Sequence, residues 1–147
     1  MTQTAVDALK GARLVSDGSL YALVKLPPNA ITAAAGVIAE ISEPFAMLMI
    51  DAYEVTLVLQ VDDFEDYKRR LPGHEISPVF YRLITFDGEL SPDLVGFMAR
   101  IAAVLAEANV WILPLGAYTR DHVLVKAHDH ETAMKALEQM LEKLKAS

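Results

Sequence analysis

Four consecutive residues that can bind or carry charge occur near the C-terminal end of the chain: Thr119, Arg120, Asp121 and His122. They separate two apolar runs in the stretch ILPLGAYTRDHVLVK, which spans 112–126. A tight hairpin turn would favour Asn-Gly or Asp-Gly. A hydroxyl, a cation, a carboxylate and an imidazole in a row are instead suited to binding a small zwitterion. The alternative is a solvated turn, in which Arg120 and Asp121 form a surface ion pair of little energetic value.

A second polar stretch, TFDGELSPD at 85–93, leads into an expected helix. The free backbone N–H groups of a helix N-terminus attract anions such as a carboxylate. Asp87, Glu89 and Asp93 supply negative charge that can hold an ammonium group, and Gly88 allows the backbone to turn closely. The loop is therefore a candidate clamp for a zwitterionic amino acid. The alternative is an acidic capping loop, because Asp and Glu favour first helical turns even without a ligand.

Pro114 interrupts the first of the two apolar runs. Proline cannot donate a hydrogen bond to a strand ladder, so the run is expected to be an edge strand or to contain a bulge. Bulges often lie beside functional sites, but a plain edge strand explains the proline equally well.

The sequence His128-Asp129-His130 suggests metal binding, because two histidines two residues apart on a strand share a face. The three residues fall, however, at an expected strand-to-helix turn, where Asp129 or His130 can cap the following helix. Capping is the favoured interpretation, and no metal site is predicted.

The composition argues against several classes of protein. The formal net charge is -7, and phosphate binding requires a basic face, so DNA and RNA are not expected partners. The absence of cysteine removes disulfides and thiolate sites and fits a reducing compartment. The first residues lack an apolar run of signal-peptide length, and no segment is apolar enough to span a membrane. We therefore expect a cytoplasmic protein with no membrane partner.

Motifs of common enzyme classes are missing from the sequence. It contains no nucleophile elbow, P-loop, GxGxxG or HExxH motif. Asp121 and His122 are adjacent, but neighbours on a strand point to opposite faces, so they are weak evidence for a catalytic pair. Neither an enzyme nor a cofactor is predicted, although a small ferredoxin-like enzyme using Asp121 and His122 is kept as an alternative.

Two parts of the chain share one pattern of elements. Each has a strand-like run, a loop, an alanine-rich helix, a strand ending in Ala-Tyr, a further strand and a charged amphipathic helix. The Ala-Tyr pairs are Ala52-Tyr53 and Ala117-Tyr118. The breakers in PGHEISP at 72–78 lie between the copies. This order predicts an α+β fold of two βαββαβ units with adjacent antiparallel sheets and helices on one face.

The predicted domains are 1–73, an N-terminal extension with the first repeat, and 74–147, the second repeat. Within the extension, residues 12–15 are expected to form an extra strand. The Asp17-Gly18 pair signals a hairpin, so this strand should pair with the opening strand of the first repeat. In the second repeat, Ser91 is the expected N-cap of the helix and Pro92 its first residue.

The stretch FYRLITFDGELSPDLVGFMARIAAVLAEANVWILPLGAYTRDHVLV, at 80–125, resembles tandem ACT-domain proteins. The similarity is to small bacterial relatives of the cytosolic arginine sensors and to the regulatory ACT domains of aspartate kinases. The first repeat matches more loosely, with Pro27-Pro28-Asn29 in place of the acidic loop and only Glu54 after its Ala-Tyr pair. The resemblance implies a ferredoxin-like regulatory protein that binds an amino acid at a domain interface, without catalysis.

The resemblance also implies particular roles for residues of the second repeat. Backbone amides near Leu94, Val95 and Gly96 would bind the ligand carboxylate. Asp87, Asp93 or Asp121 would hold its amine and Thr119 would add a hydrogen bond. The full predicted ligand site is Asp87, Gly88, Asp93, Leu94, Val95, Gly96, Leu113, Pro114, Leu115, Thr119, Asp121 and His122.

Small βαββαβ units leave sheet edges and one sheet face uncovered, so a homodimer is expected. A protein-interaction module that has lost its ligand is the main alternative function. The looser first repeat favours that alternative.

Overall fold

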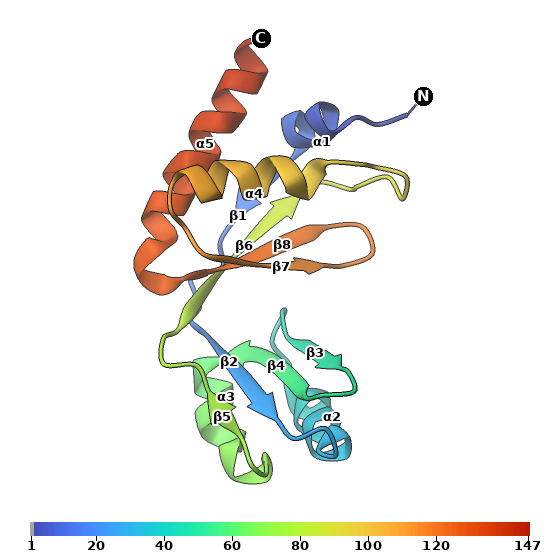
Figure 1. Ribbon diagram of the computed structural model, residues 1–147, viewed down its shortest axis with the longest axis vertical. Coiled ribbons are helices and arrows are strands. Elements are labelled where there is room, and N and C mark those ends of the chain that lie inside the picture. Colours follow the sequence, from blue (N-terminus) through green and yellow to red (C-terminus); the bar gives the residue numbers. More distant parts are fainter. Residues whose placement is uncertain (1) are drawn as a thin grey trace. The chain divides into compact units, whose positions relative to one another are not determined.

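The computed structural model of the chain describes residues 2–147 and divides them into two compact units (Figure 1). Unit 2 is the continuous segment Ser19–Tyr81, whereas unit 1 combines residues 2–18 with Arg82–Ser147. The division therefore differs from the predicted one after Gly73, because the N-terminal residues pack with the second repeat and the first repeat is inserted between the two halves of unit 1.

Unit 2 has the complete βαββαβ order of a ferredoxin-like domain. Its elements are β2 (Tyr21–Leu26), α2 (Ile31–Glu40), β3 (Met47–Ile50), β4 (Val55–Gln60), α3 (Val61–Tyr67), the short 3-10 helix η1 (Lys68–Arg70) and β5 (Glu75–Ile76). The strand order is β3-β4-β2-β5, and every pair is antiparallel. Strands β2 and β4 pair along their whole length, from Tyr21 opposite Gln60 to Leu26 opposite Val55.

The core of unit 2 lies between its sheet and its two helices. Alternate residues of β2 and β4 point to the helical side, as expected for strands that bury one face. They pack with apolar residues of α2 and with Phe64 of α3; the buried set is Ala22, Val24, Leu26, Ala30, Ala34, Val37, Val55, Leu57, Leu59, Phe64 and Leu71.

Unit 1 has the same architecture with one rearrangement. Its elements are α1 (Ala5–Gly11), β1 (Arg13–Val15), β6 (Tyr81–Asp87), α4 (Phe97–Glu107), β7 (Ile112–Gly116), β8 (Asp121–Lys126), the 3-10 helix η2 (Ala127–Asp129) and α5 (His130–Ala146). The strand order is β1-β6-β8-β7. Strand β1 precedes the rest of the unit in the chain but occupies the position of the last strand in the βαββαβ order.

The N-terminal strand was predicted to pair with the first repeat, and this was wrong. Strand β1 pairs antiparallel with β6, with Arg13 opposite Asp87 and Val15 opposite Thr85. No hairpin forms at Asp17-Gly18, because β2 continues into unit 2 and pairs with β4 and β5. The edge of β6 that βαββαβ order leaves open is filled by β1, which explains why the N-terminal residues belong to unit 1.

Helix α1 completes the core of unit 1. A capping box starts it, in which Thr4 and Asp7 exchange side-chain and backbone hydrogen bonds. Its buried residues pack with α4, α5 and the helical side of the sheet; the buried set is Ala8, Leu9, Ala12, Ile84, Phe86, Phe97, Ile101, Leu105, Val110, Val123, Val125, Ala133, Leu137 and Leu141. Figure 1 shows α1, α4 and α5 together on one side of the strands of unit 1.

Helix α4 begins five residues later than predicted, at Phe97 and not at Pro92. Ser91 and Pro92 lie in a turn closed by the hydrogen bond from Leu94 N–H to the Ser91 carbonyl, 3.1 Å. Gly96 then takes a left-handed conformation with φ 90° and is the N-cap. This conformation favours glycine because a Cβ atom would be strained there. The turn and the left-handed residue redirect the chain, so the helix begins at Phe97.

Pro114 lies on β7, which within residues 2–147 pairs only with β8 and is an edge strand, as the sequence indicates.

His128 and Asp129 belong to η2, and α5 begins at His130. The predicted side-chain cap is absent, since Asp129, the N-cap residue, makes no capping hydrogen bond. His130 Nε2 instead lies 3.0 Å from Ser16 Oγ, which links α5 to the end of β1.

Candidate functional site

A pocket of about 330 Å³ lies in unit 1, between the start of α4 and the turn that joins β7 to β8. Three of the predicted ligand residues line it: Leu94, Gly96 and Asp121. The remaining lining residues come from the 90–92 loop, the first turn of α4 and the β7–β8 turn; they are Leu90, Ser91, Pro92, Phe97, Met98, Ala99, Ala117 and Tyr118. The structure therefore brings together the two stretches from which the sequence predicted a clamp.

The first turn of α4 provides unpaired backbone donors at one wall of the pocket. Arg100 N–H donates to the Gly96 carbonyl, 3.2 Å, and closes the first turn of the helix. The three preceding amides, those of Phe97, Met98 and Ala99, have no acceptor within the helix. Gly96, the N-cap residue, has no side chain that could accept from these amides. Because the α4 dipole also favours negative charge at this end, the wall is suited to a carboxylate.

Asp121 lies on the wall formed by the β7–β8 turn. Burial raises the pKa of its carboxyl group above the ordinary value, and the neighbouring His122 only partly opposes that rise. Among residues 2–147, no basic side chain forms an ion pair with Asp121. A half-buried carboxylate without a cationic partner is a favourable position for the ammonium group of a ligand, because the ligand would supply the missing charge.

The Asp87 carboxylate forms ion pairs with two arginines, Arg13 and Arg120. Its Oδ1 atom accepts from Arg120 Nε at 2.9 Å, and its Oδ2 atom accepts from an Arg13 guanidinium N–H at 3.0 Å. The hydrogen bonds from Arg120 and then Arg13 hold the pKa of Asp87 below its ordinary value. Asp87 does not line the pocket, and its role in the structure is to tie β1 and the β7–β8 turn to the end of β6.

Thr119 joins the two walls through its backbone. Its carbonyl accepts from Leu90 N–H at 2.8 Å, which fixes the 89–96 loop against the β7–β8 turn. The Thr119 hydroxyl accepts from Arg120 at 3.1 Å. Of the four residues that the sequence singled out at 119–122, only Asp121, the first residue of β8, lines the pocket, and Thr119 and Arg120 hold the loops that shape it.

His122 points away from Asp121, as expected for neighbours on a strand. Its Nδ1 atom lies 2.8 Å from Thr85 Oγ1 on β6, and burial is the main cause that lowers the pKa of His122. His122 does not line the pocket that contains Asp121. The two side chains therefore do not form a catalytic pair around one substrate in this pocket.

The other predicted ligand residues lie outside the pocket. Asp93 and Val95 are exposed on the loop, Val95 to 84%. Gly88 packs so closely on the N-terminal segment that an added Cβ would come 3.2 Å from the Ala12 Cα atom. Three more belong to the edge strand β7, where they pair with β8: Leu113, Pro114 and Leu115.

Gln3 contributes to the site and was missed in the sequence. Its side-chain oxygen accepts from Ser91 N–H at 2.8 Å, and its side-chain nitrogen donates to the Glu89 carbonyl at 3.4 Å. These bonds hold the loop that lines the pocket. No sequence signal identifies Gln3, because it lies 88 residues from Ser91 and the predicted topology placed the N-terminal segment with the other repeat.

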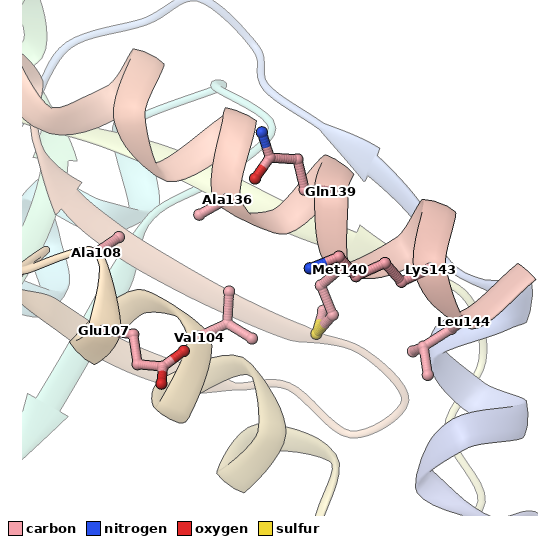
Figure 2. Close-up of a pocket in the computed structure, with 8 residues that line it drawn as sticks. All are labelled: Val104, Glu107, Ala108, Ala136, Gln139, Met140, Lys143 and Leu144. Atoms are coloured by element: carbon pink, nitrogen blue, oxygen red, sulfur yellow. The ribbon is translucent and has the colours of Figure 1, made fainter.

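A second hollow, of about 440 Å³, lies between α4 and α5 (Figure 2). Figure 2 shows Val104 and Met140 facing each other across it, with Glu107 and Lys143 at its rim. The walls are mostly apolar side chains of two packed helices, and neither a free helix start nor a half-buried carboxylate faces it. The smaller pocket near Asp121 is better suited to a polar ligand, because both the start of α4 and the Asp121 carboxylate line it.

Metal binding and membrane insertion receive no support from residues 2–147. No group of three or more His, Cys, Asp or Glu side chains within this range is arranged to hold a metal ion. None of the helices in it combines the length and the apolar sequence needed to cross a bilayer.

Comparison with known families identifies the segment that carries the pocket. Residues 77–139 match the family model of the ACT domain. Every residue that lines the pocket lies inside this ACT segment. The resemblance to ACT domains found in the sequence is therefore confirmed for the second repeat.

Solved structures extend the similarity beyond the ACT segment. A Vibrio cholerae protein of unknown function is 22% identical, with a TM-score of 0.70 over 90% of this chain and 92% of its own. An Agrobacterium tumefaciens protein is 20% identical, with a TM-score of 0.69 over 88% and 89%. The regulatory subunit of aspartate kinase from Thermus thermophilus is 12% identical, with a TM-score of 0.64 over 88% and 97%. These likenesses show the fold, and no curated protein matches the sequence.

Proposed function

We propose that this protein is a non-enzymatic regulatory protein that binds an amino acid, or a similar small zwitterion, in the pocket of unit 1. The observation that carries the proposal is the pairing of two opposite chemistries in one pocket. The uncapped start of α4 attracts a carboxylate, and the unpaired carboxylate of Asp121 attracts an ammonium group. An α-amino acid carries both groups on one carbon atom.

Two further observations support a regulatory role. The pocket lies within the segment that matches the ACT domain, and similar folds include subunits whose names state that they regulate aspartate kinase. His122, the neighbour of Asp121 in the chain, contacts Thr85 outside the pocket, which favours binding over an Asp121–His122 catalytic pair. We keep a cytoplasmic location and a homodimer as predictions.

The direct test is a thermal-shift screen with the twenty amino acids near neutral pH. A ligand present at a hundred times its dissociation constant stabilises the folded chain by about 2.7 kcal/mol, which such a screen detects. The N-acetyl and amide derivatives of any amino acid that binds should bind more weakly. The first lacks the positive charge that Asp121 would hold, and the second lacks the carboxylate for the amides of α4.

Asp121→Asn should weaken binding of the free amino acid, because it removes a charge-assisted hydrogen bond worth about 1.5–3 kcal/mol, or roughly tenfold to a hundredfold in affinity. Asp93→Asn is the matched control, because Asp93 is exposed and does not line the pocket. Asp121→Asn should also abolish the difference between the free and the N-acetyl amino acid. If all twenty amino acids leave the thermal transition unchanged, or if the two variants behave alike, the proposed function is wrong.

A further inference from the structure

The two units end in edge strands of different character. Within residues 2–147, strand β7 of unit 1 pairs only with β8, and β3 of unit 2 pairs only with β4. Each therefore presents one row of unpaired backbone groups, which natural proteins usually block with proline, charge or a bulge. In β7 the exposed Pro114 removes a donor from the middle of the strand.

Strand β3 lacks such a block. Its sequence is Met-Leu-Met-Ile, and neither a charged residue nor a proline interrupts it. Met49 is 52% exposed and Ile50 48% exposed, so apolar surface is open on both faces of the strand. The exposed Tyr53 extends this surface into the following turn. An uncharged, apolar, unprotected edge is the kind of surface to which another strand adds.

The hydrogen bonding of the turn shows which groups of β3 are open. Asp51 N–H donates inward to the Glu54 carbonyl at 3.2 Å. Because the direction of backbone groups alternates along an antiparallel strand, those of Met49 also point inward, and those of Leu48 and Ile50 point outward. The edge can therefore pair with an added strand through Leu48 and Ile50.

The charges around β3 indicate what kind of strand it accepts. Glu43 precedes the strand, and Asp51 and Glu54 follow it. Within residues 2–147, no basic side chain forms an ion pair with any of the three. Unit 2 as a whole has nine acidic and four basic side chains, three of the basic ones in η1. The apolar edge thus has negative charge at both ends.

A second copy of the chain is a poor match for this edge. Antiparallel pairing of Leu48 with Ile50 of the other copy would place the acidic turn of each β3 beside Glu43 of the other. Like charges at such positions are destabilising. A strand with lysine or arginine on either side of an apolar centre would instead meet opposite charge at both ends.

We propose that β3 is a docking edge for an extended apolar segment of another protein, flanked by basic residues, which adds to the sheet of unit 2. This inference is independent of the proposed amino-acid site, because it uses a different unit and different residues. It gives the protein a surface through which a regulatory signal can pass to a partner.

The test uses fluorescent nonapeptides with blocked ends and measures anisotropy. The probe has the sequence KKVTVTVKK, and the matched probe EEVTVTVEE has the same apolar centre with the opposite charge. The basic peptide should bind at least about tenfold more tightly than the acidic one, and the difference should shrink in 0.5 M salt because salt screens exposed charges.

Two substitutions assign the binding to β3. Ile50→Pro removes an outward donor and copies the block that Pro114 forms in β7, so it should weaken binding of the basic peptide about tenfold. Ile50→Val keeps the donor and should bind like the wild type. Circular dichroism and the amino-acid thermal shift would verify that the variants fold and that any ligand site is unaffected.

Three results would overturn the inference. They are no anisotropy change up to millimolar peptide, equal binding of the two peptides, or equal binding by the two Ile50 variants. Sedimentation of the chain alone tests whether a second copy of the chain covers β3 instead of a partner protein. If Ile50→Pro converts a dimer into a monomer, a second copy covers β3 and the inference is wrong.

Discussion

Replacing Leu9 with alanine tests whether the N-terminal helix is part of the core of unit 1. Leu9 is fully buried, and its cluster includes residues of α4, α5 and β6. Removing a fully buried leucine side chain to alanine costs about 2–5 kcal/mol, because transfer energy is lost and the neighbours fill the cavity only in part. We expect a loss of stability in this range, which is large beside the stability of a small domain, about 5–15 kcal/mol.

Urea denaturation followed by tryptophan fluorescence is a suitable assay. The chain has one tryptophan, Trp111, which belongs to unit 1, so the signal reports on the unit that contains Leu9. Lys10→Ala is the control, since Lys10 lies on the same helix and is exposed. It should change stability by less than about 0.5 kcal/mol. If Leu9→Ala and Lys10→Ala shift the midpoint equally, α1 does not belong to the core, and the assignment of the N-terminal residues to unit 1 is wrong.

Two further predictions concern the pocket loop and the effect of pH. Gln3→Ala should speed amide hydrogen exchange at Ser91, because the side-chain acceptor of that N–H is lost; unchanged exchange would show that Gln3 does not hold the loop. Burial lowers the pKa of His122 and of His130 below the ordinary value of 6.5, so the unfolded chain binds more protons just below that pH. The free energy of unfolding should therefore fall as pH falls through 6.5, and a pH-independent denaturation midpoint between pH 7 and 5 would contradict this.

Local patterns predicted most of the elements because each signal lies within a short stretch. Apolar periodicity indicates the helices that became α4 and α5, and the apolar runs on either side of 117–120 became β7 and β8. Pro114 correctly indicates an edge, since the missing N–H restricts proline to positions without a ladder bond. The repeated order of elements then led to the ferredoxin-like fold.

Pairings between distant segments could not be predicted in the same way. The Asp17-Gly18 pair is a valid hairpin signal and favours pairing of β1 with β2. The alternative for β1 is to pair with the open edge of β6, about seventy residues away in the chain. Pairing with β6 also brings Leu9 into the core and Gln3 to the pocket loop. These gains come from tertiary contacts that a local signal does not include, and they outweigh a two-residue turn preference.

The same limit explains which site residues could be recognised. Sequence identified the two loops that meet at the pocket, because their charged residues stand out between apolar runs. It could not separate the carboxylate that already has partners from the one that has none. Asp87 and Asp121 look equivalent in the sequence, yet β1 and the β7–β8 turn place Arg13 and Arg120 on Asp87, whereas Asp121 forms no ion pair with a basic side chain of residues 2–147. The proposed role of Asp121 therefore depends on where the arginines are placed, and the placement of Arg13 follows from the N-terminal strand joining unit 1.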